Sequence, residues 1–139
     1  MNARSRSVLA TVLGLMLAAV PIFAHHSFAA EYDAAKPITL TGTVTKVEWM
    51  NPHARCYLDV KDGSGNVTKW ELSMGSVQGL FRAGWNRHML KPEETITANG
   101  YLAKDGSHLA NLRSIILGDG RKMFTGAAPD APNDGSPTK

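Results

Sequence analysis

Cysteine is almost absent from the chain, because Cys56 is the single one among 139 residues. A lone cysteine excludes an internal disulfide, even in an oxidising compartment where disulfides persist. Stability must therefore come from a packed core or a bound ligand. The sequence also lacks a nucleophile elbow, a phosphate-binding loop and a metalloprotease motif. These absences favour a binding protein, and we predict that the chain is not an enzyme.

A strong excess of either charge is also absent. Fifteen Lys and Arg residues stand against twelve Asp and Glu, which gives a formal net charge of +3. Two of the basic residues, Arg4 and Arg6, lie in the first 24 residues, which contain no acid. Without that segment the balance falls to about +1, too little for electrostatic binding of DNA or RNA. We therefore expect no nucleic-acid partner.

Residues 1–24 have the three parts of a secretory signal peptide: basic Arg4 and Arg6, the apolar stretch "VLATVLGLMLAAVPIF", and small Ala24 before the cut. An uncleaved membrane anchor is the alternative, but Pro21 interrupts an apolar run that is short for a span of about 20 residues. We expect cleavage after Ala24, a periplasmic or secreted protein, and no membrane insertion afterwards.

From Ile38 to Phe124 the chain consists of short β-like runs separated by turn residues. Three runs, "ITLTGTVTKVEW", "ARCYLDV" and "VTKWELSM", precede "GSVQGLFRAGW", where Ser76 begins a short helix. "TITANGYLA" and "HLANLRSIIL" follow, and "GDGRKMF" adds a short closing strand. This β-β-β-α-β-β order predicts a mainly β domain over residues 38–124, a small five-stranded OB-like barrel. An open antiparallel sheet with one packed helix gives nearly the same pattern.

Period-2 alternation predicts which side chains face the core. In the first strand we expect a bulge at Gly42 to change the facing register and turn Val47 and Trp49 inward. Residues 25–37 form an N-terminal segment, and residues 125–139, rich in Pro, Gly, Ala and Asp, should be disordered. The other inward positions are Ile38, Leu40, Val44, Ala54, Cys56, Leu58, Val60, Trp70, Leu72 and Met74.

The runs "AHHSFAAEYD", "EWMNPH" and "LKPEETITANG" resemble those of a family of small exported bacterial proteins, domain of unknown function 6152. The resemblance covers nearly all of the chain between the leader and the tail, and it implies the same compartment and an OB-like fold. It implies no activity. The family typically has Gly-Asp or a similar polar pair where this sequence has Glu93 and Glu94.

The five histidines form no H-x-x-x-H pair and no zinc-finger spacing. Cleavage after Ala24, however, would make His25 the first residue. A free α-amine has a pKa near 8, so it deprotonates readily and chelates a metal together with the His25 imidazole. His26 offers a second imidazole and His53 a third. Nitrogen ligands in a tetragonal arrangement favour Cu(II), with nickel and zinc as weaker occupants.

Two alternatives remain open at this point. In the first, His25 and His26 are a solvated, mobile chain end, as termini usually are. In the second, Phe28 and Tyr32 provide apolar contacts that fold the terminus back across the domain. A metal-independent module would instead recognise a protein, an oligosaccharide or another ligand through its barrel face and loops. Its binding residues would then be Trp49 and Asn51 in "EWMNPH" and His88 in "NRHML".

Overall fold

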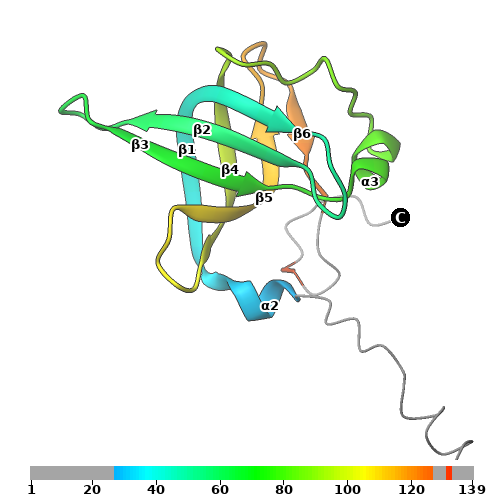
Figure 1. The fold of residues 1–139 in the computed structure, drawn as a ribbon, viewed down its shortest axis with the longest axis horizontal. Coiled ribbons are helices and arrows are strands. Elements are labelled where there is room, and N and C mark those ends of the chain that lie inside the picture. The colour runs from blue at the N-terminus through cyan, green and yellow to red at the C-terminus, as the bar shows by residue number, and fades with distance from the viewer. Residues whose placement is uncertain (1–26, 127–130, 133–139) are drawn as a thin grey trace, which may run out of the picture.

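One six-stranded sheet accounts for most of the chain in the computed structural model, which describes residues 27–126 and 131–132 (Figure 1). Two short helices accompany the sheet, so the predicted mainly β class is confirmed. The described residues contain the five predicted strands, the short closing strand expected in "GDGRKMF", and two helices where the pattern predicted one. The elements are α2 (Phe28–Glu31), β1 (Tyr32–Glu48), β2 (Arg55–Lys61), β3 (Val67–Ser73), α3 (Val77–Arg82), β4 (Thr95–Ala103), β5 (Leu109–Ile116) and β6 (Lys122–Phe124).

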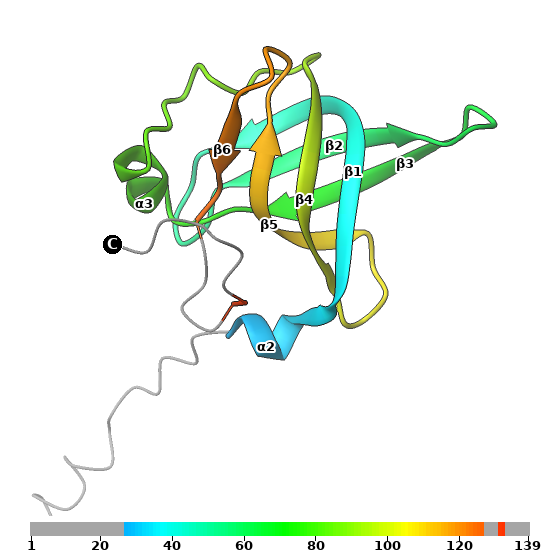
Figure 2. The same ribbon diagram turned by 180° about the vertical axis from the view of Figure 1, so that it is seen from behind.

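Neighbouring strands follow the order β3-β2-β1-β4-β5-β6, and each of these pairings is antiparallel. An additional, parallel pairing joins β3 to β5, with Glu71 opposite Leu109 and Ser73 opposite Asn111. Strand β3 therefore lies between β2 and β5. Figure 2 shows β1, β4 and β5 side by side, with the long β2–β3 hairpin crossing behind them.

Strand β1 is 17 residues long and serves two partners in turn. Its first part pairs with β4 from Tyr32 to Thr43, and its last part pairs with β2 from Thr43 to Glu48. The β1–β2 register shifts between Val44 and Lys46. The predicted change of facing therefore occurs beside Thr45 and not at Gly42, and it brings Val47 and Trp49 against the core.

Gly42 has a different role, because β1 and β2 approach closely there. A Cβ atom at this position would lie 2.5 Å from the Asp59 carbonyl oxygen.

The side chains expected to face inward do so: Leu40, Val44, Ala54, Cys56, Leu58, Leu72 and Met74 are buried, and Ile38, Val60 and Trp70 are partly buried against them. Burial raises the pKa of the Cys56 thiol to about 12, so the expectation of a buried cysteine is confirmed.

The predicted helix after β3 is present as α3. Ser76 is its N-cap, and the Ser76 hydroxyl accepts a hydrogen bond from the Gly79 N–H at 3.1 Å. Leu80 is buried beneath the helix, and the Trp85 indole N–H donates to the Phe124 carbonyl at 2.7 Å. The helix is thereby fixed against β6.

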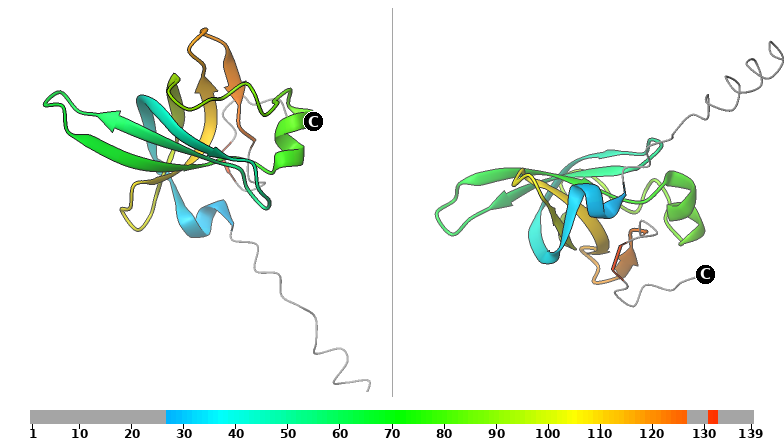
Figure 3. Two further views of the ribbon diagram at one scale, coloured as in Figure 1. Left: turned by 45° about the horizontal axis from the view of Figure 1, so that its top comes forward. Right: turned by 90° about the horizontal axis from the view of Figure 1, so that it is seen from below.

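Helix α2 begins the described chain within the segment predicted over residues 25–37, and it lies away from α3 (Figure 3). Ser27 caps it by accepting from the Ala30 N–H at 3.2 Å. Its buried side chain, Phe28, packs 5.7 Å from the Tyr32 ring and 5.5 Å from the Tyr101 ring, measured between centroids. This second hydrophobic cluster also contains Ala103, Leu109 and Ala131.

Part of the predicted tail contacts the domain. Thr125 is fully buried, its N–H donates to the Arg113 carbonyl at 3.0 Å, and its carbonyl accepts from the Gly75 N–H at 2.6 Å. Farther along, the Arg113 guanidinium donates to the Pro132 carbonyl at 3.0 Å. Residues 127–130 and 133–139 of the tail lie outside the described residues. Within the described part, no helix has the length and apolar character needed to cross a membrane.

The close approach of β4 and β5 yields a stability prediction at Gly100. A Cβ atom there would collide with the Asn111 carbonyl oxygen and lie 3.1 Å from the Leu112 Cα. We expect Gly100→Ala to lower the free energy of unfolding by roughly 1–3 kcal/mol, because backbone atoms must move apart. Urea denaturation measures this change. Gly63→Ala is the control, since nothing lies within 4 Å of its added methyl group; equal effects of the two substitutions would contradict the account.

Candidate functional site

The β3–β5 pairing gathers residues from both ends of the sheet around one cavity. Arg55 is opposite Ser73, Ser73 is opposite Asn111, and Asn111 is opposite Tyr101. Two residues farther along β4, Ala103 is opposite Tyr32 at the start of β1. The beginning of β2 and the beginning of β1 therefore meet through β3, β5 and β4.

The cavity at this junction, which we name the His53 cavity, has a volume of about 720 Å³. Its wall combines apolar groups from the second hydrophobic cluster with polar groups from β2, β3 and β5. The lining residues are Phe28, Ala30, Glu31, Tyr32, Pro52, His53, Arg55, Glu71, Ser73, Ala103, Lys104, Asp105, Leu109 and Asn111.

Three polar features mark the wall of the His53 cavity. The Arg55 Nε lies 3.0 Å from Glu71 Oε1, and both side chains are partly exposed. Burial raises the pKa of the Tyr32 hydroxyl, and a hydrogen bond with Ser73 partly opposes this rise. The side-chain oxygen of Asn111 is buried and has no hydrogen-bond partner within the described part of the chain. A buried acceptor without a partner is unfavourable, so a ligand or water molecule that donates to it would stabilise the site.

Of the three predicted metal ligands, the structure places one. His53 is exposed, lies on the cavity wall, and its imidazole forms no hydrogen bond with any described residue. His25 and His26 lie outside the described residues. Phe28 and Tyr32, expected to fold the terminus back, are 3% and 6% exposed, and both line the His53 cavity. Residues 27–126 and 131–132 contain no group of three metal-ligating side chains of their own.

The predicted ligand-binding residues are not gathered in one place. The Trp49 ring packs 5.7 Å from Phe81 and 6.3 Å from Trp85, between centroids, so it serves partly in the core. Asn51 is exposed on the β1–β2 loop. His88 lies on the long connection between α3 and β4, and it lines a separate cavity.

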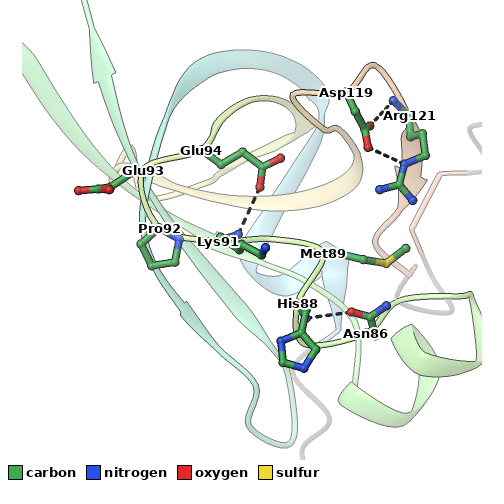
Figure 4. A pocket seen from close by; sticks show the side chains of 9 residues that line it. All are labelled: Asn86, His88, Met89, Lys91, Pro92, Glu93, Glu94, Asp119 and Arg121. Atoms are coloured by element: carbon green, nitrogen blue, oxygen red, sulfur yellow. Dashed lines mark hydrogen bonds and ion pairs between the residues drawn. The ribbon is translucent and has the colours of Figure 1, made fainter.

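This second cavity, the His88 cavity, has a volume of about 670 Å³ (Figure 4). Two of its polar side chains accept hydrogen bonds from nearby backbone N–H groups. Asn86 accepts from the His88 backbone N–H at 2.9 Å, and Glu94 accepts from the Lys91 and Gly118 N–H groups at 3.3 Å each. The Glu93 side chain points away from the others in Figure 4. The Glu94 contact with Gly118 holds the connection against the β5–β6 turn.

A third cavity, of about 390 Å³, lies over the outer side of β1, β2 and β3. Trp70 and His108 line it with their ring centroids 5.0 Å apart, and Tyr57 donates to Glu48 at 3.0 Å beside it. Sequence reasoning missed this surface and the Arg55–Glu71 pair. The register of the β2–β3 hairpin is the signal that would have revealed this surface. Once Lys61 is paired with Val67, Tyr57 lies opposite Glu71.

A family model matches residues 12–111, which is more than half of the chain. The chain belongs to the family of unknown function DUF6152. The match begins at residue 12, within the predicted signal peptide, and ends at Asn111 on the wall of the His53 cavity, so it includes the whole β1–β4 region. Comparisons with curated proteins and with solved structures give no match.

Glu93, the first residue of the pair at which the sequence departs from the family pattern that the resemblance implies, has a backbone angle φ of 70°. No other described residue apart from glycine has a positive φ. A left-handed conformation is unfavourable by roughly 1–2 kcal/mol for a residue with a Cβ atom. We therefore expect Glu93→Gly to raise the free energy of unfolding by about 1 kcal/mol in urea denaturation.

Lys91→Gly is the matched control in the same connection. Lys91 is exposed and has no positive φ, so its replacement adds only unfolded-state entropy and should lower the stability slightly. A loss of stability in both variants would show that Glu93 carries no backbone strain.

Proposed function

We propose that this DUF6152 protein is exported, is cleaved after Ala24, and binds Cu(II) through its new N-terminus together with His53. The basic, apolar and small-residue parts of residues 1–24 support export and cleavage to a periplasmic or secreted protein. The observation that carries the metal proposal is that Phe28, three residues after His25, lines the same cavity as His53.

We further propose that the fold is a five-stranded OB-type barrel closed by the β3–β5 pairing. The pairings support this, because they run from β1 through β2, β3, β5 and β4 back to β1. The position of α3, between β3 and β4 along the chain, supports it as well. Strand β6 pairs with β5 and is not one of the five strands that close the proposed barrel.

Chain connectivity limits how far the terminus reaches. Phe28 is buried and packs on Tyr32, so it fixes one end of the three-residue link. Three extended residues span at most about 10 Å. In the proposed processed chain, the His25 amine would therefore start within about 10 Å of Phe28, which lines the His53 cavity.

The donor set suits Cu(II) for chemical reasons. An α-amine and imidazole rings are nitrogen ligands, and Cu(II) is the divalent ion that binds such ligands most tightly. The amine must lose its proton before it binds, so affinity should fall as the pH drops below about 8. His53 is exposed, and its imidazole is not engaged by a described residue, which leaves a nitrogen able to complete the chelate.

A metal-independent binding module remains the second candidate function. The observation that favours it is the buried Asn111 oxygen without a partner, next to the Arg55–Glu71 pair. An amide oxygen and an ion pair suit a ligand that carries both donors and acceptors, such as an oligosaccharide or a peptide backbone. In this case binding would not depend on the terminal amine.

An N-terminal extension tests the copper proposal. We expect three residues, Gly-Ser-Ser, added before His25 of the processed protein to weaken Cu(II) binding at least tenfold. The His25 amine then becomes an amide nitrogen, and the chelate with its own imidazole is lost. Isothermal titration with a competing chelator measures the affinity, after mass spectrometry has established that the unextended protein begins at His25.

The same three residues added after Lys139 provide the control, which should bind as tightly as the unextended protein. Equal affinity of the N-terminally extended form would rule out the terminal chelate. A mature chain that begins elsewhere would do so as well, and either result would favour the metal-independent module.

A further inference from the structure

We propose that the protein binds peripherally to anionic phospholipid surfaces through a patch formed by Trp49, Met50, Phe81, Arg82 and Arg87. This patch, named the Trp49 patch, joins the β1–β2 loop to helix α3, which lie next to each other in Figures 1 and 2. It shares no residue with the proposed copper site.

Exposed apolar side chains are the first observation. Among the described large hydrophobic residues, Met50 is the most exposed at 59%, and Phe81 is 41% exposed. The Trp49 ring lies against Phe81, with the centroids 5.7 Å apart, so loop and helix present one apolar surface. Exposed apolar surface that adjoins polar groups commonly marks a site of protein or membrane interaction.

A one-sided charge distribution is the second observation. Residues 49–58 and 72–92, which meet at this patch, contain no Asp or Glu. They contain Arg55, which pairs with Glu71, and the unmatched cations Arg82, Arg87 and Lys91. The Arg87 guanidinium lies 5.7 Å from the centre of the Phe81 ring, so positive charge borders the apolar surface directly.

The neighbouring acids do not cancel this charge. Glu48, directly before Trp49, forms an ion pair with Lys46 and accepts the Tyr57 hydroxyl. Glu94 on the far side of the connection binds two backbone N–H groups. Arg82 directly follows Phe81 in α3, and the Arg87 guanidinium lies over the Phe81 ring, so positive charge borders this surface.

The chemistry of the surface favours lipid over an acidic protein segment. No residue of the Trp49 patch lines any of the three cavities described above. A peptide helix or strand needs a groove or a sheet edge to bind, whereas a lipid headgroup layer accepts exposed apolar side chains such as Met50 and Phe81. Arginines attract anionic headgroups at the same time.

Co-sedimentation with lipid vesicles tests the proposal. We expect the processed protein to bind vesicles of equal parts phosphatidylglycerol and phosphatidylcholine at low salt, and to bind pure phosphatidylcholine much more weakly. Met50→Ser with Phe81→Ser should weaken binding at least tenfold. Arg82→Gln with Arg87→Gln should weaken it roughly fivefold for each arginine removed.

Matched controls come from the opposite end of the sheet. Val67→Ser removes a side chain that is 47% exposed on β3, and Lys61→Gln with Lys69→Gln removes the same charge from exposed positions. Both controls should bind as the unaltered protein does, and urea midpoints verify that every variant is folded. Equal losses in the controls would overturn the proposal. Failure to bind anionic vesicles, with or without capture of an acidic peptide such as polyglutamate, would overturn it as well.

Discussion

The parallel pairing of β3 with β5 is the contact on which the arrangement of this molecule depends. It involves three residue pairs between segments nearly 40 positions apart in the chain. Without it, β3 would be a free sheet edge, and the beginning of β2 would lie far from the beginning of β1. With it, His53, Tyr32 and Asn111 share one cavity, and the second hydrophobic cluster has a surface on which Phe28 packs.

Five consecutive loop residues connect the two surfaces that we assign. Trp49 begins the β1–β2 loop and packs on Phe81 of α3, whereas Pro52 and His53, near the end of the loop, line the His53 cavity. The loop is held at both ends, because the Trp49 ring packs on Phe81 and Ala54 exchanges two backbone hydrogen bonds with Met74 and Gly75. A fixed loop of this kind would hold a metal ligand and a lipid-facing side chain at a constant separation.

Local features of the fold were predictable from the residues. Alternation identified the inward faces of β1, β2 and β3, and Ser76 identified the start of α3, since each signal depends on neighbours in sequence. The bulge lies beside Thr45 and not at Gly42, because glycine there is required by the close approach of Asp59. Non-local features gave no signal: the β3–β5 pairing, the Arg55–Glu71 pair and the Trp70–His108 contact each need a known register. Helix α2, only four residues long, is too short for a periodic pattern.

Electron paramagnetic resonance of the Cu(II)-loaded, processed protein tests most directly whether strand pairing brings His53 to the chain terminus. Pulsed spectra resolve couplings to the remote nitrogens of bound imidazoles. The account predicts that His53→Gln removes the coupling of one imidazole, while His88→Gln leaves the spectrum unchanged. Identical spectra of the unaltered and His53→Gln proteins would contradict it.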